Sequence, residues 1–229
     1  MDLTATSSLE DLSSVIVDCT RCPRLIGWCG EVATKKRAAY ADEIYWGKPV
    51  PGFGDPKARI AVVGLAPAAH GANRTGRMFT GDRSGDWLYR GLYRAGLANQ
   101  PNATHVDDGL ELSDVWVTSA LKCAPPMNKP TAAEQNTCRP FLRREIELLE
   151  NLRVVVSLGG IGTSAVARHF GLTPRPKFGH GVEARIDDRR VLLCSYHVSQ
   201  QNTFTGRLTE SMLDDIFGRA VELASVPVD

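Results

Sequence analysis

The sequence predicts an α/β protein, built as a three-layer α/β/α sandwich around a four-stranded parallel sheet. Four short apolar runs, at residues 59–65, 115–121, 153–158 and 191–196, are each followed closely by Gly, Pro, Ser or His. Continuous apolar runs of this kind are typical of parallel strands that are covered on both faces. Helical patterns alternate with the runs, and this alternation favours right-handed crossovers between parallel strands.

Helix signals occupy the segments between the expected strands. The expected helix starts carry residues that favour a helix N-cap or a first turn: Ser7, Ser84 or Gly85, Thr131, Thr163 and Thr209. The pairs Ser7 with Glu10, and Thr131 with Glu134, have the spacing of a capping box. Pro140 should break or kink the long helix that begins after Thr131, because proline lacks the backbone N–H.

Length and composition indicate one domain over residues 1–229, and we expect a monomer. The net charge of +1 neither favours nor excludes a nucleic-acid partner. No apolar run approaches the ~20 residues needed to cross a bilayer. The first residues lack the basic start and apolar region of a secretion signal, so the expected location is cytoplasmic and away from membranes. Residues 35–56 are expected to be irregular and packed on the sheet.

The most informative stretch is residues 64–82, which follow the first expected strand. Its sequence, GLAPAAHGANRTGRMFTGD, holds four glycines, one proline, two arginines, one aromatic residue and one carboxylate. Such a mixture of residues is not typical of a packed core. Ligands bind at the carboxyl ends of strands in open α/β sheets, and the stretch therefore predicts part of a ligand site.

A second polar segment follows the fourth expected strand. His197 comes directly after this strand and is followed by Ser199, Gln200, Gln201 and Asn202. The carboxyl ends of parallel strands share one edge of the sheet, so His197 should face the same crevice as residues 64–82. The alternative is a buried histidine with a structural role at a strand end.

The spacing of the cysteines indicates a metal centre. Cys19 and Cys22 form a C-x₂-C pair, and a helix that begins after Thr131 would bring Cys138 back toward Cys123. Four thiolates hold a structural zinc ion or an iron–sulfur cluster, and the lack of a second C-x₂-C pair favours the cluster. The alternative is a set of unlinked buried cysteines. Cys29 is a possible competing ligand, and Cys194 is expected in the core.

Three blocks together resemble the uracil-DNA glycosylase superfamily, and most closely its fifth family, the iron–sulfur enzymes of bacteria and archaea. They are residues 64–82, residues 118–130 (TSALKCAPPMNKP) and residues 197–203 (HVSQQNT). The resemblance implies the fold of that superfamily and hydrolysis of the N-glycosidic bond of uracil, or of other deaminated or modified bases, in DNA. It also implies a [4Fe–4S] cluster on Cys19, Cys22, Cys123 and Cys138.

This sequence departs from better-known relatives at two positions. It has Ala66 where they carry a catalytic acidic or amide residue, and Ser119 where they carry a base-reading asparagine. The fifth family is similar in lacking the first of these groups. The alternative function is a non-catalytic module of the same fold that binds damaged DNA, and Ala66 favours it.

A mechanism within this resemblance assigns a role to each polar side chain. After the nucleotide has flipped out of the duplex, Phe79 stacks on the base and His197 donates a hydrogen bond to its carbonyl oxygen. Asp82 orients the attacking water and stabilises the cationic sugar, with a helix cap as its alternative role. Asn128 reads the edge of the base, with a turn residue as its alternative.

The remaining candidates are expected to shape the pocket or hold the DNA. The pocket wall is expected to include Leu65, Ala66, Pro67 and Ser119. The segment Ser199, Gln200, Gln201 and Asn202 would fill the gap in the duplex or hold phosphates. Phosphate contacts are expected from Arg74, Arg77, Lys129 and Arg207. This reading depends on Phe79 and His197 facing each other across one cleft.

Overall fold

A six-stranded sheet with the order β1-β3-β2-β4-β6-β5 forms the centre of the computed structural model, which describes residues 3 and 5–226. Its four inner strands are parallel: β2 (Ile60–Gly64), β3 (Val115–Ser119), β4 (Val154–Leu158) and β6 (Val191–Ser195). These strands confirm the four parallel strands predicted from the apolar runs. The edge strands β1 (Phe53–Gly54) and β5 (Glu183–Arg185) pair antiparallel and are too short to leave a pattern in the sequence.

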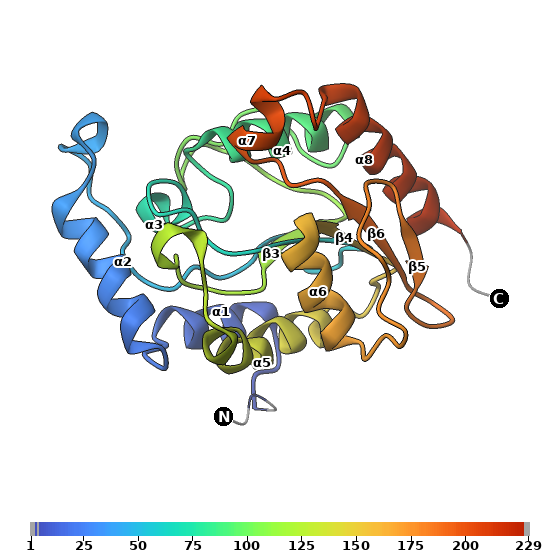
Figure 1. The fold of residues 1–229 in the computed structure, drawn as a ribbon, viewed down its shortest axis with the longest axis horizontal. Helices are drawn as coiled ribbons and strands as arrows, with labels where there is room; N and C mark the ends of the chain where they lie inside the picture. The colour runs from blue at the N-terminus through green and yellow to red at the C-terminus, as the bar shows by residue number, and fades with distance from the viewer. Residues whose placement is uncertain (1–2, 4, 227–229) are drawn as a thin grey trace.

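Helices cover both faces of the sheet, which confirms the predicted three layers (Figure 1). One layer holds α4 (Arg83–Arg94) and α8 (Glu210–Ser225), and the other holds α1 (Leu9–Val17), α5 (Ala132–Leu148) and α6 (Gly159–His169). Alternate strand residues point to opposite faces. Val62 therefore packs in the cluster beneath α4 and α8, whereas Val63 packs beneath α5 and α6.

Two of the longer helices depart from the sequence prediction in their existence or their course. Helix α2 (Pro23–Lys35) was not predicted, although its buried Leu25, Cys29 and Val32 have helical spacing and its proline stands at a favourable first position. The predicted break at Pro140 is wrong, because α5 continues through it as one helix. Apolar side chains on both sides of Pro140 are buried, and this packing offsets the missing backbone hydrogen bond.

Two of the predicted helix starts are confirmed and three differ. Asp82, and not Ser84 or Gly85, caps α4, and α6 begins at Gly159, four residues before Thr163. Thr131 forms the predicted capping box with Glu134, and Thr209 caps α8. The box at α1 uses Ser8 with Asp11, one residue later than the sequence indicated. Helix α6 begins directly after β4, because Gly159 adopts a left-handed conformation (φ 78°) that turns the strand into the helix without a loop.

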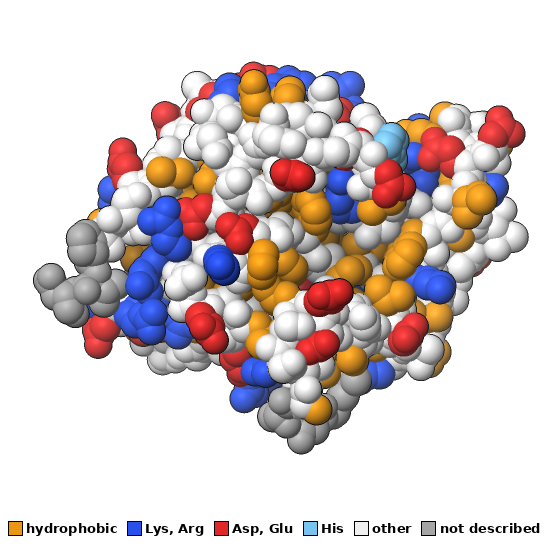
Figure 2. Space-filling model, turned by 180° about the vertical axis from the view of Figure 1, so that it is seen from behind, with side chains coloured by type: hydrophobic (Ala, Val, Ile, Leu, Met, Phe, Trp, Pro, Cys, Tyr) orange, Lys and Arg blue, Asp and Glu red, His pale blue; other side chains and the backbone are white. Residues whose placement is uncertain are grey.

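The remaining elements are short. They are η1 (Ala38–Tyr40), α3 (Ala72–Thr75), η2 (Pro126–Asn128) and α7 (Gln200–Phe204). Apart from η1 and β1, residues 36–56 lack helix and strand, as predicted. Basic and acidic side chains are interspersed on the face shown in Figure 2. None of the helices in the described part of the chain has the length and apolar character that a membrane span requires.

Candidate active site

A cleft of about 410 Å³ lies at the carboxyl ends of β2, β4 and β6. This is the edge of the sheet where ligands bind in open α/β folds. The cleft brings together eleven of the residues singled out in the sequence: Leu65, Ala66, Pro67, Phe79, Asp82, Asn128, His197, Ser199, Gln201, Asn202 and Arg207. The segments after the first and fourth parallel strands therefore form one site.

Phe79 and His197 face each other inside this cleft. Their ring centroids lie 6.3 Å apart, with the ring planes tilted by 38°. Phe79 adopts a left-handed backbone conformation (φ 52°), which is uncommon for an aromatic residue. The turn thus presents an aromatic face to the cleft opposite an imidazole, the arrangement on which the sequence interpretation depends.

His197 is held as a neutral, half-buried imidazole that lines the cleft. Burial lowers its pKa to about 4, so the ring is uncharged at neutral pH. Its backbone carbonyl accepts a hydrogen bond from Asn202 Nδ2 at 2.8 Å, which fixes the segment after β6. Nδ1 is buried and has no hydrogen-bond partner among the described residues. A neutral imidazole can donate one hydrogen bond to a group in the cleft.

Asp82 combines a structural contact with a position in the cleft. Its Oδ1 accepts the backbone N–H of Gly85 at 3.0 Å and caps α4, so the alternative role as a helix cap is real. Its Oδ2 lies over Gly71. A Cβ atom at position 71 would stand only 1.9 Å from Oδ2, so a larger residue would collide with the carboxylate. Burial raises the pKa of Asp82, although the N–H groups of Gly85 and Ser84 oppose the shift. One oxygen thus serves the helix, and the carboxylate still lines the cleft.

Asn128 lies on a strained turn at the edge of the cleft. Met127 and Asn128 both have a left-handed backbone, with φ of 53° and 56°. Asparagine tolerates this conformation better than most residues, which agrees with the alternative role as a turn residue. The same turn places Asn128 in the cleft lining, so both roles remain compatible with the geometry.

The segment after β6 is partly helical. Ser199 precedes the short helix α7, on which Gln201 and Asn202 line the cleft. Gln200 is not part of the lining. The guanidinium of Arg207 lies 4.7 Å from the centre of the Tyr196 ring, at the same cleft. Among the residues predicted to contact phosphate, Arg207 lies at the cleft.

Arg74 and Arg77, which the sequence predicted to contact phosphate, are instead buried. Arg74 is 7% exposed and pairs with Glu43, while its Nη2 donates to the carbonyl of Gly81 at 2.7 Å. Arg77 is 3% exposed and pairs with Asp108. Both guanidinium groups form their ion pairs and hydrogen bonds inside the protein, so neither is free to contact DNA.

Ser119 also departs from its predicted role in the pocket wall. It ends β3, is fully buried, and donates its hydroxyl to the carbonyl of Leu121. It does not line the cleft. Ser119 lies on the same face of β3 as Val115 and Val117, and α4 and α8 cover this face.

Sequence reasoning missed several residues of the cleft. They are Ala68, Met78, Ser84, Leu158, Gly159, Gly160, Ile161, Phe178 and Tyr196. Gly159 and Gly160 follow a parallel strand directly, so the rule that placed residues 64–82 also applies to them. Phe178 lies between strands in an irregular segment and leaves no such signal.

The four cysteines singled out in the sequence line one narrow cavity. Cys19 and Cys22 come from the chain between α1 and α2, Cys123 follows β3, and Cys138 lies on α5. The backbone N–H of Lys122 donates to the Cys138 sulfur at 3.3 Å. Within residues 3 and 5–226, no three His, Cys, Asp or Glu side chains are placed to hold a single metal ion. A cavity with four sulfur donors and no carboxylate suits a group that prefers thiolate ligands.

The other two cysteines are buried and do not line this cavity, although the Cys29 thiol lies within hydrogen-bond reach of the Cys123 thiol. Cys29 on α2 donates its thiol to the carbonyl of Ala124 at 3.7 Å and is absent from the lining of this cavity. Cys194 lies in β6 and belongs to the core, as predicted.

Comparison with known proteins agrees with this geometry. A family model described as the uracil DNA glycosylase superfamily matches residues 51–219. The type-5 uracil-DNA glycosylase of Mycobacterium tuberculosis is 52% identical over 222 residues, which cover 96% of this chain and 83% of that protein. The type-5 uracil-DNA glycosylase of Thermus thermophilus is 48% identical over 218 residues, covering 95% and 99%. A type-4 uracil-DNA glycosylase of Pyrobaculum aerophilum is 28% identical over 194 residues, covering 82% of each.

The parallel sheet, the cleft at its carboxyl edge and the matched residues define an α/β protein of the uracil-DNA glycosylase class. Similarity to the type-5 proteins extends over nearly the whole chain. The chain belongs to the type-5 family of the uracil DNA glycosylase superfamily.

Proposed function

We propose that this protein hydrolyses the bond between deoxyribose and uracil in DNA and leaves an abasic site. Membership of the type-5 family supports this function. The observation that carries it is the single cleft in which Phe79 and His197 lie 6.3 Å apart, beside Asp82. A base inside a duplex is out of reach, so the nucleotide must first flip out, at a cost of a few kcal/mol.

Each side chain in the cleft has a step to perform. Phe79 stacks on the flipped base, a contact worth roughly 1–3 kcal/mol. His197 donates a hydrogen bond to the carbonyl oxygen where negative charge develops as the bond breaks. Asp82 orients the water and faces the developing positive charge on the sugar. Asn128 reads the edge of the base.

The DNA backbone is held at the rim of the cleft. Ser199, Gln201 and Asn202 supply hydroxyl and amide groups, which bond to phosphates without adding charge. Arg207 supplies the positive charge. Gln200 does not line the cleft, and we assign it a contact with the duplex outside the cleft.

The direct test uses a labelled duplex that contains one uracil. We expect free uracil to be released, and the strand to be cut at that position after alkali treatment. Duplexes that each contain one other deaminated or modified base define the substrate range. Tight binding of the uracil duplex without release would contradict hydrolysis and favour the non-catalytic DNA-binding module.

We further propose that Cys19, Cys22, Cys123 and Cys138 hold a [4Fe–4S] cluster. When bound, the cluster ties together the chain before α2, the end of β3 and α5. The purified protein should contain about four iron atoms and four sulfides per chain. Cys138→Ser should lose iron, whereas Cys194→Ser should retain it. Stoichiometric zinc without iron in the wild-type protein would contradict the cluster.

The partial burial of His197 predicts an unusual pH dependence. An ordinary histidine takes up a proton near pH 6.5. His197 should stay neutral until the pH approaches about 4, because burial penalises its charged form. Below pH 6.5 the unfolded chain binds this proton and the folded protein does not, so acid destabilises the fold through this residue.

Nuclear magnetic resonance titration of the imidazole checks this prediction directly. We expect its resonances to remain unchanged between pH 8 and about 5. Protonation of His197 should therefore cause no loss of the rate of uracil release near pH 6.5. The pH profiles of the wild-type protein and of His197→Gln should have the same shape in this range. A proton uptake by His197 near pH 6.5 would contradict the neutral donor.

A further inference from the structure

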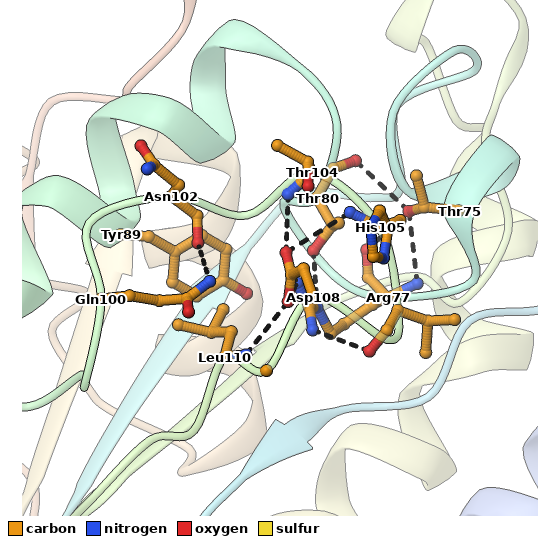
Figure 3. A network of polar contacts seen from close by, with 12 residues as sticks. Thr75, Arg77, Thr80, Tyr89, Gln100, Asn102, Thr104, His105, Asp108 and Leu110 are labelled. Carbon is orange, nitrogen blue, oxygen red and sulfur yellow. Dashed lines mark hydrogen bonds and ion pairs between the residues drawn. The ribbon is translucent and has the colours of Figure 1, made fainter.

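A buried ion pair joins Arg77, two residues before Phe79, to Asp108 (Figure 3). Neither side chain lines the cleft. Arg77 uses all three guanidinium nitrogens. Nη2 donates to both Asp108 oxygens at 2.8 and 2.7 Å, Nη1 donates to the Val106 carbonyl at 3.1 Å, and Nε donates to Thr80 Oγ1 at 2.9 Å. The guanidinium thus joins the Phe79 turn to the segment before β3.

Asp108 organises that segment in turn. Its Oδ2 accepts the backbone N–H of Thr104 at 2.7 Å, and its Oδ1 accepts that of Leu110 at 3.1 Å (Figure 3). Burial opposes ionisation of this carboxyl, but Arg77 and the backbone N–H groups outweigh it and lower the pKa of Asp108. The carboxylate is therefore charged at neutral pH, and the pair with Arg77 is complete.

Both neighbours of Phe79 are fixed. The carbonyl of Met78 accepts the hydroxyl of Tyr89 at 2.6 Å, and Thr80 is fully buried with its hydroxyl bonded to Arg77 Nε. The N–H of Gly81 donates to the Ala103 carbonyl at 2.8 Å, from the segment that Asp108 organises. A left-handed non-glycine residue persists only where its surroundings hold it, and these contacts hold Phe79.

We propose that Arg77 and Asp108 form a positioning pair that fixes the Phe79 ring for the flipped base. This inference rests on the function proposed above. It explains why a cation stands in the turn and yet is withdrawn from solvent. The pair acts through Phe79 and not on DNA, because the guanidinium is fully occupied inside the protein.

The test measures the single-turnover rate of uracil release in Arg77→Met, Arg77→Lys and Asp108→Asn. Each should lose about 10- to 100-fold, the range that loss of one base–aromatic stack covers. Lysine should not rescue the rate, because its partners Asp108, Val106 and Thr80 are placed around the three separate nitrogens of a planar guanidinium, and a compact ammonium is a single nitrogen. Arg185→Met removes an exposed pair with Asp188 and serves as the control, with an unchanged rate.

The effect of Arg77→Met is also measured in a protein that already carries Phe79→Ala. This comparison separates a positioning role of Arg77 from a general structural role. If Arg77 acts through Phe79, Arg77→Met should change the rate less than about threefold in that background, because the ring it positions is gone. An equal loss in both backgrounds would overturn the proposal. So would a decrease of about one in the slope of duplex affinity against salt, which indicates a phosphate contact.

Hydrogen exchange of the backbone tests the pair without any reaction. Asp108→Asn should speed exchange in a peptide over residues 77–83 while α8 keeps its wild-type protection. Unchanged exchange in that peptide would overturn the positioning role. Failure of the wild-type protein to release uracil would instead count against the proposed function, and the exchange measurement would still decide for or against the pair.

Discussion

His197→Ala should lower the rate of uracil release by about 100- to 1,000-fold. A preorganised donor at the site of developing negative charge contributes on the order of 3–4 kcal/mol to the transition state. The neutral imidazole of His197 is such a donor, because burial keeps it uncharged and Asn202 fixes its backbone. The measurement is a single-turnover rate with enzyme in excess over a uracil duplex.

The affinity for DNA separates catalysis from binding at this position. His197→Ala should bind a duplex without uracil as tightly as the wild-type protein does, because His197 lines the cleft that we propose takes only the flipped base. His197→Gln keeps an N–H donor and should recover part of the rate. Equal losses of affinity and rate would show that His197 is only a binding group.

Asp82→Asn should slow uracil release by about 100-fold or more, the lower end of the contribution of a positioned acid or base. Asparagine caps a helix as well as aspartate does, so α4 should keep its N-cap. The variant thus removes the charge in the cleft and leaves the helix in place. Asp86→Asn, an exposed carboxylate in the first turn of the same helix, is the matched control and should retain the full rate.

The stability of Asp82→Asn provides a second readout. The raised pKa of Asp82 means that the folded state holds its proton more tightly than the unfolded state does. Stability contributed by this group is therefore present at low pH and is lost as the pH rises through the raised pKa. The variant should be at least as stable as the wild-type protein at neutral pH, with the difference disappearing in acid. Full activity in Asp82→Asn would show that another group directs the water.

The parallel strands could be predicted because their information is local. Val62 and Val63 lie in a continuous apolar run, and a central strand buried on both faces requires one. The end of each strand then fixed the place of the site. Phe79 and His197 are 118 residues apart in the sequence, yet the rule that ligands bind at the carboxyl edge brought them into one cleft.

The contacts that depend on distant segments could not be predicted. Arg77 and Asp108 are 31 residues apart, and nothing in the sequence around either residue indicates that they pair. Arg77 was therefore interpreted as a surface cation for DNA. Lys122 and Glu145 form a similar buried pair, with Nζ 2.6 Å from Oε2. The buried face of Ser119 and the neutral state of His197 likewise follow from packing, which no local pattern records.

The most direct test of this account is a crystal structure of Asp82→Asn bound to a duplex with a single uracil. We expect the uracil to lie outside the base stack, with its ring on Phe79 and a carbonyl oxygen within hydrogen-bond distance of the His197 ring. A uracil that remains paired in the duplex would contradict the proposed role of the cleft. So would a uracil that enters the protein elsewhere while the space between Phe79 and His197 stays empty.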